Sequence, residues 1–304
     1  MPTTGRGSTE VPAGALRDRW RSLRHGLGEW RRSLALWWRG IRARGGELRR
    51  FFLPRLKRGL AWWWCSREQT NFTYALTERN RRHLAHALAL ACGVPAEAAW
   101  RAMGELDEDR AFRERIMERR RSTGLESISD PRVQVGRRLA WYAAVRLTRP
   151  RLVIETGVDK GLGAAVLCAA LLRNAGEGHP GRYLGTDIDP GAGRLLGPPY
   201  DTVGRILYGD SIASLEAIDG PIDLFVNDSD HSAAYEAREY RTIEAKLAPG
   251  ALIIGDNAHV TDELMRFAEA TGRHFLFVKE VPAGTWYPGD GIGFAFAARR
   301  DGGR

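Results

Sequence analysis

The chain has 304 residues, and 43% of them are hydrophobic, including ten tryptophans, ten phenylalanines and eight tyrosines. This length fits one large or two modest domains, and the apolar content excludes a wholly disordered chain. The longest apolar run, residues 164–172, is too short to span a bilayer, and no apolar segment near the start has the form of a secretory signal. Three scattered cysteines show neither metal spacing nor a disulfide pattern, so we expect a cytoplasmic protein in a reducing compartment.

The formal net charge of +9 is unevenly distributed along the chain. Residues 1–67 hold 16 Lys and Arg against four Asp and Glu, a net of +12, and they contain seven of the ten tryptophans. The remaining residues hold 30 basic against 33 acidic side chains, a net of −3. The sequence therefore predicts a basic, aromatic arm over 1–67 that is attached to a slightly acidic body.

The arm carries apolar residues at helical spacing, alternately four and three positions apart. They are Leu16, Trp20, Leu23, Leu27, Trp30, Leu34, Trp37 and Ile41. This stripe predicts an amphipathic helix, and a second basic piece follows that we expect to be broken at Pro54. Three interpretations stay open: a charged extension without a partner, an interfacial helix, or a stripe that forms a homo-oligomer. The interfacial helix would place residues 14–64 peripherally on anionic lipid at the inner face of the membrane.

Residues 68–136 are predicted to form a helical cap region. Thr77 is a candidate N-cap for a helix that ends near Gly93, and residues 107–121 form a charged, solvated helix. Ser129 or Asp130 would cap a further helix over residues 131–147.

From residue 151 onward, short apolar runs alternate with helical stretches. These runs are residues 151–156, 182–188, 205–208, 222–226, 251–254, 274–278 and 291–297. The alternation is typical of an α/β fold with a doubly wound parallel sheet. Only a Pro- and Gly-containing turn joins the last two runs, so we expect these two strands to pair antiparallel.

Polar residues follow several of these predicted strands. Glu155, Gly157 and Gly161 form a glycine-containing turn after the first strand, while Asp187 ends the second. Asp210 and Ser211 follow the third strand, where Asp210 could bind an adenine amino group or simply cap a helix. The carboxyl ends of parallel strands meet at one edge, so these residues are expected to line a ligand crevice.

The fourth and fifth strand ends carry the largest number of oxygen donors. Asp228, Asp230 and His231 follow the fourth strand, and Asp256 and Asn257 follow the fifth. Grouped carboxylates and an amide are suited to a hard cation such as Mg²⁺, and the alternative is a hydrogen-bonded polar rim without metal.

Taken together, these motifs in residues 137–304 resemble class I S-adenosylmethionine-dependent methyltransferases, in particular O-methyltransferases of the catechol, macrocin and methyltransferase 24 kind. The resemblance rests on the Glu155–Gly161 turn, Asp187, the Asp210–Ser211 pair, the run 228–231 and the run 247–257. It implies a Rossmann-like, doubly wound, seven-stranded sheet in the order 3-2-1-4-5-7-6, with the last strand antiparallel and an N-terminal helical extension.

The resemblance also assigns roles to residues. Glu155, Gly157 and Gly161 would bind the methionine end of S-adenosylmethionine, Asp187 the ribose, and Asp210 with Ser211 the adenine side. Asp228, Asp256 and Asn257 would hold a divalent cation. The relatives' lysine base falls on His231, which makes His231 the candidate base beside Asp228, with His259 as a second candidate.

The function that we expect is O-methylation of a hydroxyl on a small-molecule or sugar-containing metabolite, assisted by Mg²⁺. One alternative is a nucleic-acid methyltransferase that uses the basic arm. The acidic body and the position of Pro198-Pro199-Tyr200 after the second strand, rather than the fourth, count against nucleic acid as a partner. Another alternative is a non-catalytic nucleotide-binding body whose arm binds a membrane or a protein partner.

Overall fold

The computed structural model describes residues 13–297, and it describes side chains from Glu29 onward. These residues form two compact units, one ending at Leu60 and one beginning at Ala61. Within the described residues, no helix is both long enough and apolar enough to cross a membrane. The apolar stripe of the arm is described from Trp30 onward, while Leu16, Trp20, Leu23 and Leu27 lie outside the described side chains.

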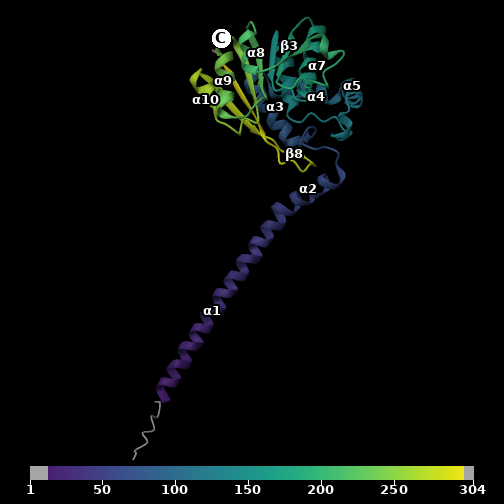
Figure 1. The fold of residues 1–304 in the computed structure, drawn as a ribbon. Coiled ribbons are helices and arrows are strands. Elements are labelled where there is room, and N and C mark those ends of the chain that lie inside the picture. The colour runs from purple at the N-terminus through teal and green to yellow at the C-terminus, as the bar shows by residue number, and fades with distance from the viewer. Residues whose placement is uncertain (1–12, 298–304) are drawn as a thin grey trace, which may run out of the picture. The chain divides into compact units, whose positions relative to one another are not determined.

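The arm is helical along its described length (Figure 1). α1 (Ala13–Glu47) continues into a five-residue π-helix, η1 (Leu48–Phe52), which leads directly into α2 (Leu53–Cys65). The predicted break at Pro54 is wrong, because the chain stays helical through Pro54, and the π-helical turn of η1 lies directly before it.

The second unit contributes further helices and short strands. They are β1 (Ala75–Leu76), α3 (Glu78–Cys92), α4 (Ala96–Glu108), α5 (Arg110–Ser122), η2 (Leu125–Ser127), α6 (Arg138–Thr148), α7 (Leu162–Gly176), η3 (Tyr200–Thr202), α8 (Ser211–Ala217), α9 (Ala233–Glu244), α10 (Glu263–Ala270) and β8 (Pro282–Ala283). The predicted caps of α3 are confirmed: Thr77 Oγ1 accepts from the N–H of Asn80, and Gly93 takes the left-handed conformation.

Two predicted helix boundaries are wrong. α4 extends through Glu108, and Asp109 then caps α5 by accepting from the N–H of Phe112, so residues 107–109 belong to the junction of two helices. Residues 131–137 are not helical, because Gly136 has a φ of +53° and α6 begins only at Arg138. Arg137 therefore lies in a loop immediately before α6.

A seven-stranded sheet forms the centre of the second unit. Its strands are β2 (Leu152–Thr156), β3 (Arg182–Asp187), β4 (Gly204–Tyr208), β5 (Ile222–Asn227), β6 (Leu247–Asp256), β7 (Arg273–Lys279) and β9 (Gly291–Ala297). They lie in the order β4-β3-β2-β5-β6-β9-β7, and β9 runs antiparallel to both of its neighbours. This arrangement confirms the predicted fold class and strand order.

Apolar side chains point alternately to the two faces of the sheet along its strands. Helices cover both faces, and a hydrophobic core lies between the sheet and the helices on each side. Val153, Leu224 and Ile254 face one core together with residues of α3 to α7, while Ile154 and Phe225 face the other with residues of α8, α9 and α10. Figure 1 shows these helix groups on opposite sides of the sheet. The result is a three-layer α/β unit whose loops at the carboxyl ends of the strands remain free to bind a ligand.

Candidate active site

A cavity of 470 Å³ opens at the carboxyl ends of the parallel strands. Its lining includes residues that the sequence placed at four separate strand ends: Gly157, Asp187, Asp210, Ser211 and Asp228. The structure therefore brings these predicted residues together, as expected for the point where a doubly wound sheet reverses its strand order.

The turn after β2 requires glycine at Gly157. Its φ is +80°, and a Cβ atom at this position would lie 2.1 Å from the backbone oxygen of Asp228. Gly161, with a φ of +91°, is the residue that precedes α7. Gly157 lets the loop after β2 pack directly against the loop after β5, and Gly161 lets it pack against Gly193 in the segment after β3, so a ligand can approach the backbone there.

Asp187 is held in place by the loops around it. Its Oδ2 accepts from the N–H of Asp159 and its Oδ1 from the N–H of Asp189, both at 2.8 Å. Asp210 caps α8 by accepting from the N–H of Ala213, which confirms the capping interpretation of this residue. Both carboxylates line the cavity while each is fixed by backbone donors, which preorganises them for binding.

Ser211 lies at the start of α8, and its hydroxyl is already bonded to neighbouring side chains. Ser211 Oγ donates to Glu239 and is 2.8 Å from the hydroxyl of Tyr235. Tyr235 in turn donates to Asp210 at 3.2 Å. The side chain of Ser211 is thus part of the wall of the cavity.

Glu155 is buried beside the glycine turn, in a second cavity of 180 Å³. Tyr183 donates its hydroxyl proton to Glu155 Oε2. Burial raises the pKa of Glu155 from its ordinary value of 4.5 to about 8, although the bond from Tyr183 opposes the rise. The two cavities share Gly157, Asp159 and Asp228, so Glu155 faces a space that is next to the larger cavity.

The predicted metal ligands also converge. Ligand atoms of Asp228, His231 and Asp256 all lie within 4.8 Å of one another, and Asn257 stands next to them, with Nδ2 3.1 Å from His231 Nε2. Burial and the neighbouring carboxylate of Asp256 raise the pKa of Asp228 well above its usual range.

A buried arginine that the sequence did not indicate occupies this cluster. Arg137 donates from Nε and Nη2 to the two carboxylate oxygens of Asp256, and from Nη2 to Asn257 Oδ1 at 3.2 Å. Against the effect of burial, this guanidinium lowers the pKa of Asp256. Three of the expected metal-binding oxygens therefore already bind a cation of the protein itself, and the set as it stands does not fit a resident divalent ion.

His231 is oriented by a buried carboxylate. Its Nδ1 is 3.2 Å from Glu236 Oε1, and Thr261 donates to the other oxygen of Glu236. The bond to Glu236 raises the pKa of His231. With Nδ1 protonated towards Glu236, Nε2 carries the lone pair on the side of Asp228, whose Oδ1 is 3.8 Å away. Glu236 could have been noticed in the sequence only as a helix residue five positions after His231.

The second candidate base, His259, lies elsewhere. Its Nε2 is 3.5 Å from Asp290 Oδ1, and its ring packs near Phe277. It pairs with the segment before β9 and not with the carboxylates after β5.

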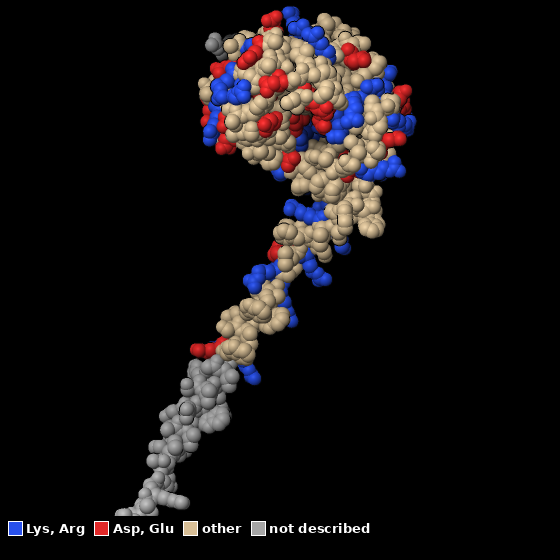
Figure 2. All heavy atoms as spheres, in the orientation of Figure 1, with Lys and Arg blue, Asp and Glu red and all other residues tan. Residues whose placement is uncertain are grey.

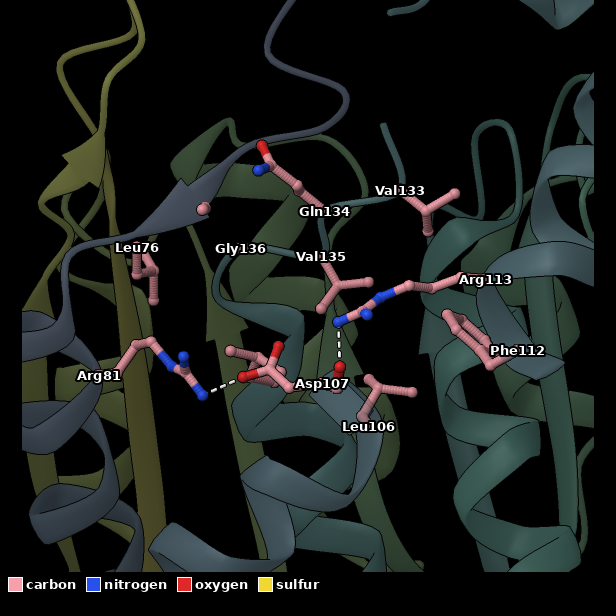
Figure 3. A pocket seen from close by; sticks show the side chains of 12 residues that line it. Leu76, Arg81, Leu106, Asp107, Phe112, Arg113, Val133, Gln134, Val135 and Gly136 are labelled. Carbon is pink, nitrogen blue, oxygen red and sulfur yellow. Dashed lines mark hydrogen bonds and ion pairs between the residues drawn. The ribbon is translucent and has the colours of Figure 1, made fainter. Parts of the chain in front are cut away.

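A third cavity, of 140 Å³, lies on the helical side of the unit (Figure 3). Arg81 from α3 points at the carboxylate of Asp107, and Arg113 from α5 donates to the backbone oxygen of Asp107. Residues 133–136 line this cavity and lead directly to Arg137. The ion pair thus joins the helices that surround the loop carrying Arg137.

Residues 154–258, about a third of the chain, match the model of a family described as "Methyltransferase domain" (Methyltransf_24). No curated protein matches the chain.

Several solved structures are similar to this chain. An O-methyltransferase from Bacillus cereus in complex with SAH has 16% identity and a TM-score of 0.46, covering 61% of this chain and 91% of that one. The O-methyltransferase TomG from Streptomyces achromogenes, in complex with SAM, has 18% identity and a TM-score of 0.47, covering 63% and 91%. A methyltransferase from Geobacter sulfurreducens has 18% identity and a TM-score of 0.46, covering 64% and 94%.

Proposed function

We propose that this chain, whose residues 154–258 match a methyltransferase domain, is an S-adenosylmethionine-dependent methyltransferase that methylates a hydroxyl oxygen of a small molecule. The observation that carries the proposal is the pair of adjoining cavities. One is lined by four of the predicted cofactor residues, Gly157, Asp187, Asp210 and Ser211, and the other reaches from Glu155 to Asp228 and Asp256. A cofactor in the first cavity would meet an acceptor close to the cluster around His231.

The residues of the larger cavity fit the cofactor. S-adenosylmethionine carries a sulfonium cation, and the carboxylates of Asp187, Asp210 and Asp228 line the cavity. The position of Gly157, where a Cβ would meet backbone, keeps that side open to a ligand. In this proposal Asp187 binds the ribose, Asp210 and the backbone at Ser211 bind the adenine side, and Glu155 faces the methionine end.

When bound, S-adenosylmethionine would supply an electrophilic methyl group to an acceptor oxygen by in-line displacement, with the methyl–sulfur bond breaking and S-adenosylhomocysteine leaving. The side chains around His231 hold the acceptor, and His231 itself accepts its proton. His231 Nε2 takes the hydroxyl proton, because Glu236 holds the ring with Nδ1 as the donor. Asn257 Nδ2 lies 3.1 Å from Nε2, so this amide stands beside the nitrogen that takes the proton. Asp228, at 3.8 Å, stabilises the imidazolium that forms.

Nucleic-acid methylation is the less well supported activity. The loop after β5 reads Asn227-Asp228-Ser229-Asp230, and Pro198-Pro199 lies instead between β3 and β4. The base-methylating arrangement of prolines beside the catalytic strand end is therefore absent from this described loop.

Titration calorimetry with S-adenosylmethionine tests the cofactor part of the proposal. Wild type is expected to bind, while Asp187→Ala binds at least about tenfold more weakly, because it loses an acceptor for the ribose hydroxyls. Absence of binding by a folded wild-type chain would refute the enzyme assignment.

A radiolabelled methyl-transfer assay tests the reaction with separate panels of catechols, sugar-containing metabolites and oligonucleotides. Transfer to a hydroxyl panel is expected. His231→Gln should lower kcat by about a hundredfold or more and leave cofactor affinity unchanged, since general-base catalysis contributes at that scale. Thr261→Val is the matched control, because its hydroxyl donates to Glu236 rather than to the imidazole, and it should have a much smaller effect. Transfer to oligonucleotides alone would refute O-methylation of a small molecule.

A further inference from the structure

The first inference concerns the cation of the active site and rests on the proposed function. Arg137 presents five N–H donors, and the structure gives them six acceptor oxygens within reach. Three of these belong to Asp256 and Asn257. The other three lie around Nη1, at 3.1, 2.6 and 3.3 Å, and belong to Tyr74, Glu280 and Tyr287.

These contacts make the guanidinium a fixed part of the site. Its side chain is 5% exposed, while the side chains of Asp256 and Glu280 are 0% and 2% exposed. Removal of the guanidinium would leave two buried carboxylates without the partner that forms their ion pairs, which is strongly unfavourable. Arg137 therefore does not exchange freely with ions from solution.

The same contacts occupy the oxygens that a metal would need. Both carboxylate oxygens of Asp256 and the amide oxygen of Asn257 accept from Arg137, and Asn257 turns its Nδ2 towards His231. Of the three predicted ligands, only Asp228 accepts no hydrogen bond from Arg137 among the described contacts. A divalent ion prefers six or more oxygen ligands, and it would also lie next to a fixed positive charge.

We propose that Arg137 takes the place of the divalent cation, and that methyl transfer by this chain needs no metal. Arg137 is a positioning residue here: it neutralises Asp256 and holds Asn257 beside His231, and it has no spare N–H for a substrate. The loop before α6 supplies it, since Gly136 takes a φ of +53° with the ring of Tyr74 packed against it.

Mn²⁺ binding, followed by electron paramagnetic resonance, tests this proposal without an acceptor and is independent of the proposed reaction. Wild type is expected to leave millimolar Mn²⁺ unbound. Arg137→Ala exposes the donor set and should bind Mn²⁺ at least about tenfold more tightly. The control is the double variant Arg137→Ala/Asp256→Ala. It lacks the arginine and, in addition, a carboxylate that the metal would need, so it should not bind Mn²⁺.

Stoichiometric Mn²⁺ binding by wild type that Asp228→Asn abolishes would overturn the proposal. If Arg137→Ala does not fold, the comparison of wild type with Asp228→Asn decides the question. Once an acceptor is known, exhaustive dialysis against EDTA gives a second readout, since the rate should be unchanged. A failure of the proposed O-methylation would show as absent transfer and would leave the Mn²⁺ result intact.

A second inference rests on a different observation, the surface of the arm over residues 29–60. Trp30, Trp37 and Leu48 are each more than half exposed. Trp37 and Leu48 lie seven and 18 residues after Trp30, close to two and five whole turns, so the three side chains lie on one face of the helix. Phe52 and Leu56 continue the exposed apolar surface through η1 and α2.

Most basic side chains lie away from this stripe. Arg32 and Arg39 each follow a stripe residue by two positions, about 200° around the helix, while Arg44 lies seven positions after Trp37, on the side of the stripe, where its long side chain can reach towards headgroups. Residues 29–60 contain ten Lys and Arg against two Asp and Glu. Figure 2 shows blue side chains along the described part of the arm with tan surface between them.

We infer that this amphipathic surface binds an anionic lipid membrane in the plane of the interface. Exposed tryptophan and leucine on one face, with arginine on the other, match the two requirements of such a helix, an apolar face to insert and positive charge to meet the headgroups. The charge of the arm favours lipid over a second copy of the same surface, because two arms of equal positive charge repel.

Vesicle co-sedimentation of the full chain tests this inference. Wild type is expected to bind phosphatidylcholine vesicles that contain phosphatidylglycerol and to bind pure phosphatidylcholine far less. Trp37→Glu/Leu48→Glu should reduce the bound fraction at least about tenfold. Leu36→Glu is the matched control: Leu36 is 65% exposed but one position off the stripe, so binding should be largely kept.

Equal sedimentation of wild type and the stripe variant would overturn the inference. The inference would also be overturned if wild type did not bind vesicles and analytical ultracentrifugation showed a dimer that the stripe variant does not form. Binding to RNA but not to anionic vesicles would refute it as well.

Discussion

The buried carboxyl group of Glu155 makes the stability of this protein depend on pH in a measurable way. Burial raises its pKa from 4.5 to about 8, so the folded chain holds a proton that the unfolded chain has lost at neutral pH. For a raised carboxyl pKa, the cost to stability is absent below the unfolded value of 4.5 and grows as the pH rises towards 8. Glu155→Gln keeps the shape and removes the ionisation.

The size of the effect follows from the two pKa values. One pKa unit corresponds to about 1.4 kcal/mol, so the full effect above pH 8 is about 5 kcal/mol. At pH 7 the linked cost is about 3 kcal/mol, and at pH 5 it is about 1 kcal/mol. The free energy of unfolding of Glu155→Gln, relative to that of wild type, should therefore rise by about 2.5 kcal/mol from pH 5 to pH 7.

Urea unfolding of both proteins at pH 5, 6, 7 and 8 measures this difference. Subtracting the two free energies of unfolding at each pH cancels the other titrating groups, so only the slope is compared. In the Glu155→Gln variant, Tyr183 can still donate to the amide oxygen that replaces the carboxylate, which limits structural change. A difference that stays constant within about 0.5 kcal/mol across this range would refute the assignment of a raised pKa to Glu155.

Three further predictions concern single positions. Asp187→Asn should weaken S-adenosylmethionine binding about tenfold or more in calorimetry, because a neutral amide replaces a charged acceptor, and equal affinity would contradict the ribose role. Gly157→Ala should cost more than about 2 kcal/mol in urea unfolding, since its Cβ would clash with backbone, whereas Gly178→Ala, with a φ of +86° and open space, should cost only about 1–2 kcal/mol. Thr77→Ala should lose about 1 kcal/mol through the N-cap of α3, and an unchanged midpoint would argue against that cap.

The strands could be predicted because each carries its own signal. Runs such as residues 152–156 and 222–226 are largely apolar, since the central parallel strands are buried on both faces. Once the alternation of strands and helices is known, the carboxyl ends must share one edge, which brings Asp187, Asp210 and Asp228 together without any long-range information. The prediction of this cavity therefore followed from topology.

The arginine in the cluster could not be predicted in the same way. Arg137 lies 119 residues before Asp256 and 143 before Glu280, and no local pattern records those contacts. The periodicity of residues 131–147 favoured a helix, which would have made Arg137 one more surface residue among many arginines. The loop exists because Gly136 takes a left-handed conformation under the ring of Tyr74, and that packing is tertiary.

The charges of the described site also explain why an arginine suits it. Burial raises the pKa of Asp228 and of Glu155, so the site disfavours additional ionised carboxylates at these two positions. Arg137 forms ion pairs with the buried carboxylates of Asp256 and Glu280, and Arg138 adds a second positive charge that acts on Asp256. A divalent ion would have to lie beside these fixed guanidinium groups, in a buried place where unpaired charge is unfavourable. The arginine thus supplies the positive charge that a metal would otherwise bring to Asp256.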